Sequence, residues 1–416
     1  MVVIKLSNYF KYTLDCGLPF IYIYKPEFHK CYAGIGVKYG SSDVDFELDG
    51  IKYHSPDGLA HFIEHKLFLM PKGDTFAEFA KLNAIANAYT TCDRTIYFFT
   101  TTSDLEKPLK LLLDMYFTPY FPKEAVESEK SIINSEIRMY DDILETKFNQ
   151  AILEALYPKH PLSKQVAGTI ESVNKTSKED IEGAYKAFYT CENSRLVIVG
   201  NKDPKIILKM VKEILKPLKL LNHQSKKLMT NDYAKPTPKI NMELNVPQNL
   251  VTLAIRFNAS NKIPLFCNYI IGIFDCLLSP VSRFYQELYK NGAFKADIEY
   301  YVNTLDATSY AIISTTSDKP KLFLEMLRTK LMNIEVADLD NDILENYIKH
   351  LRARAISELD TIEALGDNVL DLALEDIDYF NEQELMSKLA PKDFKRYLKY
   401  FKTAHYVEAI CKKVQK

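Results

Sequence analysis

The sequence predicts an α+β fold built from two homologous domains. Within each half, strand-like segments come first and long helical segments follow, which is typical of an α+β domain. The string Thr-Thr-Ser-Asp occurs at 101–104 and again at 315–318, an offset of 214 residues. A chain of 416 residues also exceeds the size at which a single hydrophobic core stops growing. Together these observations favour two domains of similar construction.

The same offset of 214 relates further segments of the chain. It aligns 177–181 with 391–394, each directly before a helical segment rich in Tyr and Lys. Each copy then ends in a strand-like segment, 195–199 in the first half and 407–411 in the second. Similarity at a fixed period is the signature of a structural repeat. We therefore expect the second half to repeat the fold of the first.

The first half contains its elements in unequal runs. We expect strands over 10–24, 31–39 and 96–102, and helices over 106–117, 123–144 and 179–189. Such runs predict a mainly antiparallel sheet with helices packed on one face. A stretch rich in Lys, Asn and Pro then loses its apolar period. The expected domains are therefore 1–215 and 240–416, joined by a linker over 216–239.

Composition excludes several classes of function. With 53 Lys and Arg against 55 Asp and Glu, a net charge of -2 gives no general attraction to nucleic acid or to an anionic membrane. The apolar run 263–281 contains Asn268 and Asp275, so a buried helix is favoured over a membrane span. The seven cysteines include no C-x-x-C pair, and 1–24 lacks the pattern of a secretion signal. We expect reduced thiols and a cytoplasmic protein.

Residues 58–65 carry the most informative motif, an H-x-x-E-H arrangement that suggests a zinc peptidase. On a helix, His61 and His65 are one turn apart, so both imidazoles can bind one metal ion. Glu64 leans toward the same face. A catalytic zinc ion takes three protein ligands and keeps one position open, so the motif lacks one ligand.

A later helix offers two candidates for the missing ligand. Glu129 and Glu136 are seven residues apart and therefore share one face of the segment 123–144. The residue types alone leave both open, because glutamates are common on solvated helices.

These two helices resemble those of the pitrilysin/insulysin family of zinc peptidases, which includes mitochondrial processing peptidase. Further similar segments follow in family order: 57–62, 86–90, 119–121, 160–162 and 199–201. The resemblance implies that Glu136 is the third ligand and that Glu129 supports the site without binding the metal. The spacing from His65 to Glu136 is 71 residues, a little short for the family, which suggests a deletion near 70–74.

The resemblance also implies the chemistry. It predicts a zinc endopeptidase with one Zn²⁺ per chain, in which the ion activates a water molecule at neutral pH. Glu64 is then expected to act first as general base and afterwards as general acid. The segment 86–90 resembles the family's substrate-binding edge strand, so Asn87 and Ala88 are the candidate substrate-binding residues. Backbone pairing at such an edge favours flexible peptides or unfolded segments as substrates.

The second half lacks the metal ligands. At the offset of 214, the motif residues fall on Gly272, Asp275, Leu278 and Ser279, so this half is expected to be a degenerate domain. Active family members also use an Arg and a Tyr from this half to hold substrate. Here Tyr289 and Phe294 stand at the expected positions, and either the nearby Arg283 and Tyr285 replace them or another chain does.

The length of the chain points to the second option. Relatives that work as one polypeptide are about twice as long and close four such domains around a chamber. The resemblance therefore implies half of a clamshell that pairs with a metal-free homologue or, as the second alternative, with another copy of itself. Two rivals remain: a non-catalytic assembly or peptide-binding subunit of the same fold, and a structural zinc module, which would need four ligands.

Overall fold

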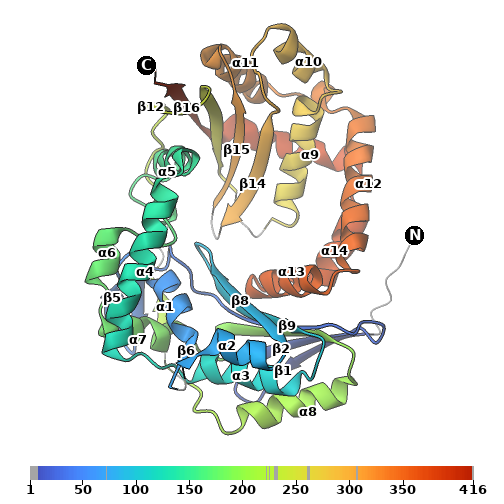
Figure 1. Ribbon diagram of the computed structural model, residues 1–416. Coiled ribbons are helices and arrows are strands. Elements are labelled where there is room, and N and C mark those ends of the chain that lie inside the picture. Colours follow the sequence, from blue (N-terminus) through green and yellow to red (C-terminus); the bar gives the residue numbers. More distant parts are fainter. Residues whose placement is uncertain are drawn as a thin grey trace. The chain divides into compact units, whose positions relative to one another are not determined.

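The computed structural model contains helices and mainly antiparallel sheets, which confirms the α+β class (Figure 1). It describes residues 8–71, 73–221, 223, 225–228, 233–259, 263–305 and 308–414. Parts of the expected linker 216–239, and position 72 within the expected deletion, lie outside these described residues.

Packing divides the chain into two compact units, and each takes residues from both halves of the sequence. The first unit comprises Met1–Arg138, Lys164–Met229 and Ile356–Tyr379, and the second comprises Met139–Ser163, Thr230–Ala355 and Phe380–Lys416. These units are not the ranges 1–215 and 240–416, which stay a prediction about the internal repeat.

The first unit is built on a six-stranded sheet in the order β1-β2-β10-β3-β9-β8. Its strands are β1 (Tyr9–Thr13), β2 (Pro19–Tyr24), β3 (Cys31–Val37), β8 (Ala84–Thr90), β9 (Thr95–Thr101) and β10 (Ser194–Gly200). Only the β2–β10 pair is parallel among them. β8 lies at one edge of the sheet and pairs with β9.

One face of this sheet forms the main core. Alternate residues of β3, namely Ala33, Ile35 and Val37, are fully buried there among residues of the covering helices. The helices of this unit before α13 are α1 (Leu59–Leu67), α2 (Thr75–Lys81), α3 (Glu106–Phe117), α4 (Lys123–Asp141), α6 (Ile170–Lys175), α7 (Lys178–Phe188) and α8 (Pro204–Leu215). The short strands are β4 (Asp45–Leu48), β5 (Ile51–His54), β6 (Leu69–Met70), β7 (Gly73–Asp74) and β11 (Ser225–Lys227), and β11 pairs with β4.

The opposite face of the same sheet is covered by α13 (Ile362–Leu374), a helix from the second half of the sequence (Figure 1). β3 has glycines on this face. A Cβ added to Gly34 would lie 3.0 Å from Leu370 Cδ2, and one added to Gly36 would lie 2.7 Å from Leu374 Cδ1. The glycines therefore permit the close approach of the helix. The sheet therefore has helices on both faces, whereas the sequence predicts helices on one face only.

The second unit repeats this sheet without the first strand. Its order is β12-β16-β13-β15-β14, with β12 and β16 parallel and the other pairs antiparallel. The strands are β12 (Lys239–Leu244), β13 (Leu250–Phe257), β14 (Glu299–Leu305), β15 (Thr308–Thr316) and β16 (His405–Lys413). The first unit has the same arrangement in its strands β2-β10-β3-β9-β8, again with the first pair parallel and the others antiparallel. This agreement confirms that the domains are related.

The helices of the second half follow the repeat as well. They are α9 (Phe266–Leu278), α10 (Arg283–Lys290), α11 (Pro320–Met332), α12 (Asn341–Glu358), α14 (Tyr379–Ser387), α15 (Pro391–Phe394) and α16 (Leu398–Thr403). α9 is the buried helix expected within 263–281. No helix among the described residues is long and apolar enough to cross a membrane.

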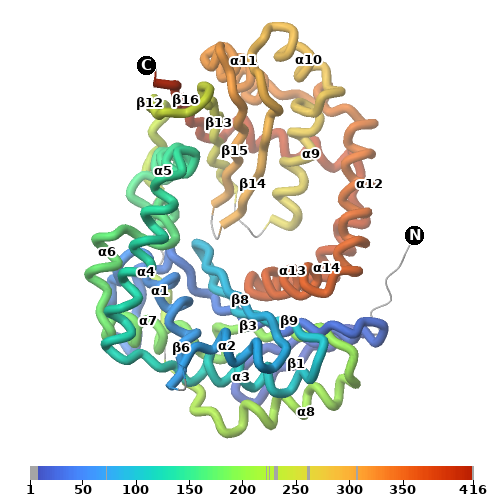
Figure 2. The backbone as a smooth tube through the Cα atoms, viewed as in Figure 1, coloured from blue at the N-terminus to red at the C-terminus, as the bar shows by residue number. Residues whose placement is uncertain are grey.

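The sheet of the second unit also has a helix on its other face, and this one comes from the first half of the sequence. α5 (Leu144–Leu156) lies against this sheet (Figure 2). Its Phe148 and Ile152 share one buried cluster with Ala254, Val407 and Ala409 of the sheet. α5 and α13 stand at corresponding places in the two repeats, so the halves of the chain exchange one helix.

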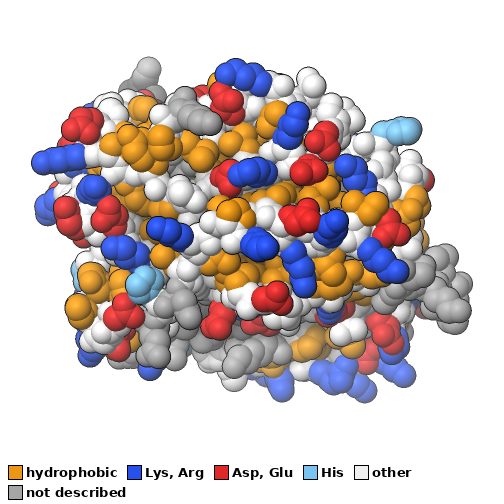
Figure 3. Space-filling view, turned by 90° about the horizontal axis from the view of Figure 1, so that it is seen from below, with side chains coloured by type: hydrophobic (Ala, Val, Ile, Leu, Met, Phe, Trp, Pro, Cys, Tyr) orange, Lys and Arg blue, Asp and Glu red, His pale blue; other side chains and the backbone are white. Residues whose placement is uncertain are grey.

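The surface agrees with the balanced composition. The face drawn in Figure 3 carries Lys and Arg side chains interspersed with Asp and Glu, without a field of one sign.

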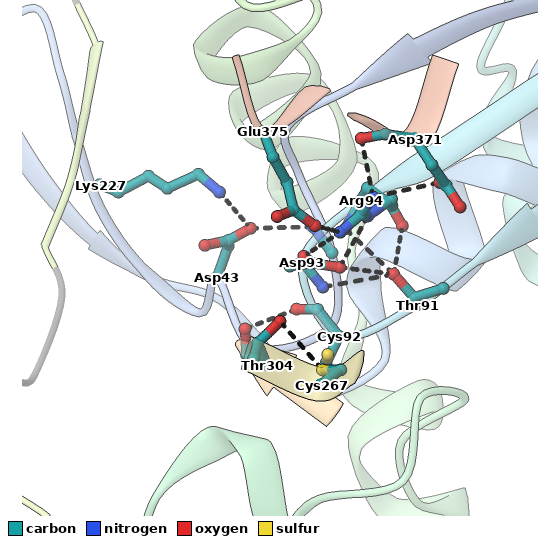
Figure 4. Close-up of polar contacts among 12 residues, drawn as sticks. Asp43, Thr91, Cys92, Asp93, Arg94, Lys227, Cys267, Thr304, Asp371 and Glu375 are labelled. Carbon is teal, nitrogen blue, oxygen red and sulfur yellow. Dashed lines mark hydrogen bonds and ion pairs between the residues drawn. The ribbon is translucent and has the colours of Figure 1, made fainter. Parts of the chain in front are cut away.

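The segment that carries α13 is held by charged contacts. Arg94, which lies between β8 and β9, donates hydrogen bonds to Asp93, Asp371 and Glu375 at 2.7, 3.1 and 2.6 Å (Figure 4). Asp371 and Glu375 come from α13 and the residue after it, so Arg94 ties this segment to the sheet.

Candidate metal centre

The helix α1 begins where two segments of backbone cross at glycines. Gly58 has φ +87°, and a Cβ added to it would lie 2.4 Å from the Ala167 carbonyl oxygen. A Cβ on Gly168 would lie 2.3 Å from the Asp57 carbonyl oxygen. Only glycine fits such a crossing. From Leu59 onward the helix buries Phe62 and Ile63 completely, which leaves His61, Glu64 and His65 on another side.

Three side chains meet beside α1 in an arrangement that could hold a metal ion. Glu136 on α4 places Oε1 3.7 Å from His61 Nε2 and Oε2 3.6 Å from His65 Nε2. The three ligand atoms all lie within 4.8 Å of one another. Zinc bonds of about 2.1 Å place tetrahedral ligand atoms roughly 3.4 Å apart, so the spacing suits an ion with a fourth position left for another group.

Glu129 occupies a different place from Glu136, although both project from α4. The Nδ1–H of His65 donates a hydrogen bond of 3.0 Å to Glu129 Oε1, on the side of the ring away from Glu136. Buried Val126, Ile133 and Ile137 fix the face of α4 from which both carboxylates extend. Glu129 is therefore placed to orient His65, while Glu136 is placed to bind what the two histidines bind.

The surroundings shift the pKa values of the two histidines in opposite directions, downward for His61 and upward for His65. Burial, helped by the adjacent His65, lowers the pKa of His61 to about 4, although Glu129 acts in the opposite direction. His61 is thus neutral near pH 7, with a nitrogen lone pair available. Burial also acts to lower the pKa of His65, but the hydrogen bond to Glu129 and the charges of Glu64, Glu129 and Glu136 raise it overall.

Glu64 is held from the edge strand. Thr90, the last residue of β8, donates a hydrogen bond of 2.6 Å from Oγ1 to Glu64 Oε2. Burial raises the pKa of Glu64, partly offset by this hydrogen bond and by the charge of His65. A carboxylate with a raised pKa beside a metal site has the properties of a general base.

The site includes two side chains, Thr90 and Lys66, that the sequence analysis does not predict. Thr90 lies within the segment 86–90, but nothing in its type or spacing singles it out. Lys66 is 4% exposed, and its Nζ donates a hydrogen bond of 2.9 Å to Glu129 Oε2. The available signal was a lysine between His65 and the apolar Leu67 and Phe68, since lysine is rarely buried unless paired.

Asn87 and Ala88, the candidate substrate-binding residues, lie on the edge strand β8. Asn87 is exposed, and its Oδ1 accepts a hydrogen bond of 2.9 Å from the Ala88 N–H. That N–H therefore points to the side chain of its neighbour, and β9 is the strand that pairs with β8.

The described residues of the second half form no comparable site. Among the described residues, His61, His65 and Glu136 form the one group of three or more side chains with metal-ligand spacing. Asp275, which corresponds to His61 by the offset, instead accepts a hydrogen bond from Tyr300. Tyr289 is 65% exposed on α10, and Phe294 is buried against Tyr285 with ring centroids 4.9 Å apart.

Comparison with known proteins places this geometry in a family. The model of insulinase (peptidase family M16) matches residues 20–170, and that of the peptidase M16 inactive domain matches residues 175–351. The zinc protease YmfH of Bacillus subtilis, described as uncharacterized, is 41% identical over 211 residues, which are 50% of this chain and 47% of that protein. The putative zinc protease AlbF of Bacillus subtilis is 30% identical over 194 residues, 46% of this chain and 45% of that protein. The matches thus span about half the length of these curated relatives.

Solved structures match over nearly the whole chain. A putative M16-like peptidase from Alicyclobacillus acidocaldarius is 26% identical with a TM-score of 0.89, covering 97% of this chain and 98% of that one. A protease from Helicobacter pylori shares the fold with a TM-score of 0.77 at 19% identity, covering 97% and 99%. Because the two family models follow one another along the chain and the fold agrees throughout, the protein belongs to the insulinase family of peptidases, peptidase family M16.

Proposed function

We propose that this protein is a zinc-dependent endopeptidase that hydrolyses peptide bonds in flexible peptides or unfolded segments. The observation that carries the proposal is the convergence of His61, His65 and Glu136, with ligand atoms within 4.8 Å of one another. Relatives named as zinc proteases support it.

The donor set suits Zn²⁺. Two imidazoles and one carboxylate are the ligands of several catalytic zinc sites, and the fourth position stays open. When bound, zinc would supply Lewis-acid activation of a water molecule and of the scissile carbonyl. Glu64 would accept the proton of the attacking water and return it to the leaving amine, while Thr90 holds its carboxylate and Glu129 orients His65.

The edge strand β8 supports an extended peptide as substrate. A peptide that adds to this edge would pair its backbone with that of Asn87 and Ala88, and the bond of the Ala88 N–H to Asn87 would open to receive it. Backbone pairing carries little sequence information, which favours unfolded segments.

We infer that the active form is a dimer, with a metal-free homologue or, as a second option, with another copy of this chain. Tyr289 and Phe294 stand where the family's Arg and Tyr are expected. The fold of this chain also matches 47% of the longer periplasmic protease PqqL of Escherichia coli, at 15% identity. We further propose a cytoplasmic location, which all seven cysteines, present as free thiols, support.

The first test replaces Glu64. Glu64→Gln should keep one zinc ion per chain and abolish cleavage of an unstructured peptide, because the carboxamide cannot accept the proton. Glu127→Gln, an exposed glutamate of α4 that pairs with Lys130, is the matched control and should retain activity. Metal content and chelator-sensitive cleavage are the measurements. Undiminished cleavage by the Glu64 variant contradicts the role of Glu64, and zinc binding without any cleavage favours the non-catalytic subunit.

A further inference from the structure

Lys66 is a buried cation whose one charged partner in hydrogen-bond range, among the described residues, is Glu129. Its side chain is 5% exposed, against 13% for that of Glu129, and Nζ lies 2.9 Å from Oε2. Burying an ammonium group costs several kcal/mol unless a charge partner compensates for it. The ion pair with Glu129 therefore accounts for a lysine at this buried position, which apolar packing alone does not.

The two oxygens of Glu129 serve different neighbours. Oε2 accepts from Lys66, and Oε1 accepts from the Nδ1–H of His65 at 3.0 Å. The other nitrogen of His65 faces Glu136. Lys66, Glu129, His65 and the candidate metal position thus form a continuous polar chain.

The two candidate histidine ligands are held in different ways. His61 is 9% exposed, and its buried Nδ1 has no hydrogen-bond partner among the described residues, so packing fixes this ring. His65 is more exposed, with 23% of its side chain accessible, and it depends on the hydrogen bond to Glu129. A disturbance of Glu129 should therefore reach the metal through His65.

Lys130, on α4, forms an ion pair that lies outside this polar chain, and its Nζ also donates a hydrogen bond of 3.1 Å to the Asn174 carbonyl oxygen. Lys130 pairs with Glu127 at 2.9 Å, three residues away on the same helix, and Glu127 is 55% exposed. Lys66 differs because it reaches from α1 to α4, is buried, and shares its partner with His65.

We propose that Lys66 is a positioning residue of the metal centre: its ammonium group fixes the carboxylate of Glu129 in place, so that Glu129 in turn orients His65 toward the metal. This inference rests on the proposed function, because it assumes that His61, His65 and Glu136 bind zinc. It assigns Lys66 no contact with substrate.

The test is a double-mutant cycle read by zinc affinity, measured by competition with a chromophoric chelator. Lys66→Met keeps the length of the side chain without its charge and should weaken zinc binding roughly 10-fold, since disturbing such outer partners costs 10- to 100-fold in affinity. Glu129→Gln should weaken it by a similar or larger factor. In the Glu129→Gln background, Lys66→Met should change the affinity by less than about twofold, because the partner through which it acts is gone.

Lys130→Met is the matched control and should leave zinc affinity unchanged. Urea unfolding of the metal-free proteins separates positioning from folding, because a purely structural ion pair would lower stability and leave zinc affinity alone. Unchanged zinc affinity in Lys66→Met, or fully additive losses in the double variant, would overturn the inference. Absence of zinc binding by the wild-type chain would instead overturn the proposed function.

Discussion

At the scale of single residues, the hydrogen bond from Thr90 to Glu64 connects the edge strand to the candidate base. Thr90→Val keeps the shape of the side chain and removes the 2.6 Å hydrogen bond. Hydrogen bonds to charged groups contribute about 1.5 to 3 kcal/mol, so we expect kcat to fall at least about 10-fold with little change in KM. Thr90→Ser should retain most of the activity. Steady-state kinetics on an unstructured peptide provides the test, and equal kcat values for the wild type and the valine variant would contradict this role.

At this scale, the sequence predicts the placement of side chains where that placement follows from local spacing. His61 and His65 share a helix face because they are four residues apart, and the sequence alone shows this. Glu129 and Glu136 could not be told apart from spacing, since both lie on one face of α4 and differ only in which edge of the His65 ring they meet. Thr90 and Lys66 were missed because their partners come from other elements.

At the scale of elements, the fit of α13 against the sheet should be sensitive to a single methyl group. A Cβ at Gly366 would lie 2.3 Å from Cδ1 of Tyr32, whose side chain is fully buried. Gly366→Ala should therefore destabilise the protein by about 1 to 3 kcal/mol through overpacking. Gly183→Ala in α7 is the matched control, because its Cβ would meet Tyr53 at an ordinary 3.7 Å.

The control should move in the other direction. Alanine is favoured over glycine within a helix by about 0.8 to 1 kcal/mol, so Gly183→Ala should raise the free energy of unfolding. Urea denaturation measures both variants. Equal effects at the two positions would show that the packing of α13 on Tyr32 is looser than the distances indicate.

The charged contacts of the same segment predict a dependence on pH. Burial acts to raise the pKa of Asp93, but the hydrogen bond and charge of Arg94, with Thr91 and Lys227, lower it below the ordinary 3.8. A carboxylate with a lowered folded-state pKa contributes stability that is complete above the unfolded pKa and is lost as pH falls through the folded one. Asp93→Asn should therefore lose less stability than the wild type from about pH 5 to about pH 3. Parallel curves in urea unfolding at stepped pH would refute this.

At the scale of elements, the sequence predicts whether a segment forms a helix or a strand, but it does not predict which sheet a helix packs against. The apolar patterns of β3, α3 and α9 give their type, and the strand order of the second unit agrees with the expected repeat. The places of α5 and α13 could not be foreseen, because an apolar face specifies that a helix is buried but not against which sheet.

At the scale of the whole molecule, the proposed dimer makes a prediction about activity. The purified chain alone should cleave an unstructured peptide slowly, and addition of a metal-free homologue from the same genome should raise the rate and form a complex in sedimentation velocity. The exposed Tyr289 and buried Phe294 give the reason, since neither offers the cation of the family's arginine. A monomer that reaches its full rate without a partner would exclude the dimer.

The exchange of α5 and α13 has a consequence for the order in which this protein matures on the ribosome. Among the described residues, the last strand of the sheet that carries the edge strand β8 is β10, which ends at Gly200, yet the helix that covers its second face ends at Leu374. Nascent chains usually fold domain by domain from the N-terminus. Here the first sheet should wait, with Tyr32, Gly34 and Gly36 uncovered, until the residues of α13 have been synthesised, so that the unit with the candidate metal centre reaches its final packing only after they emerge.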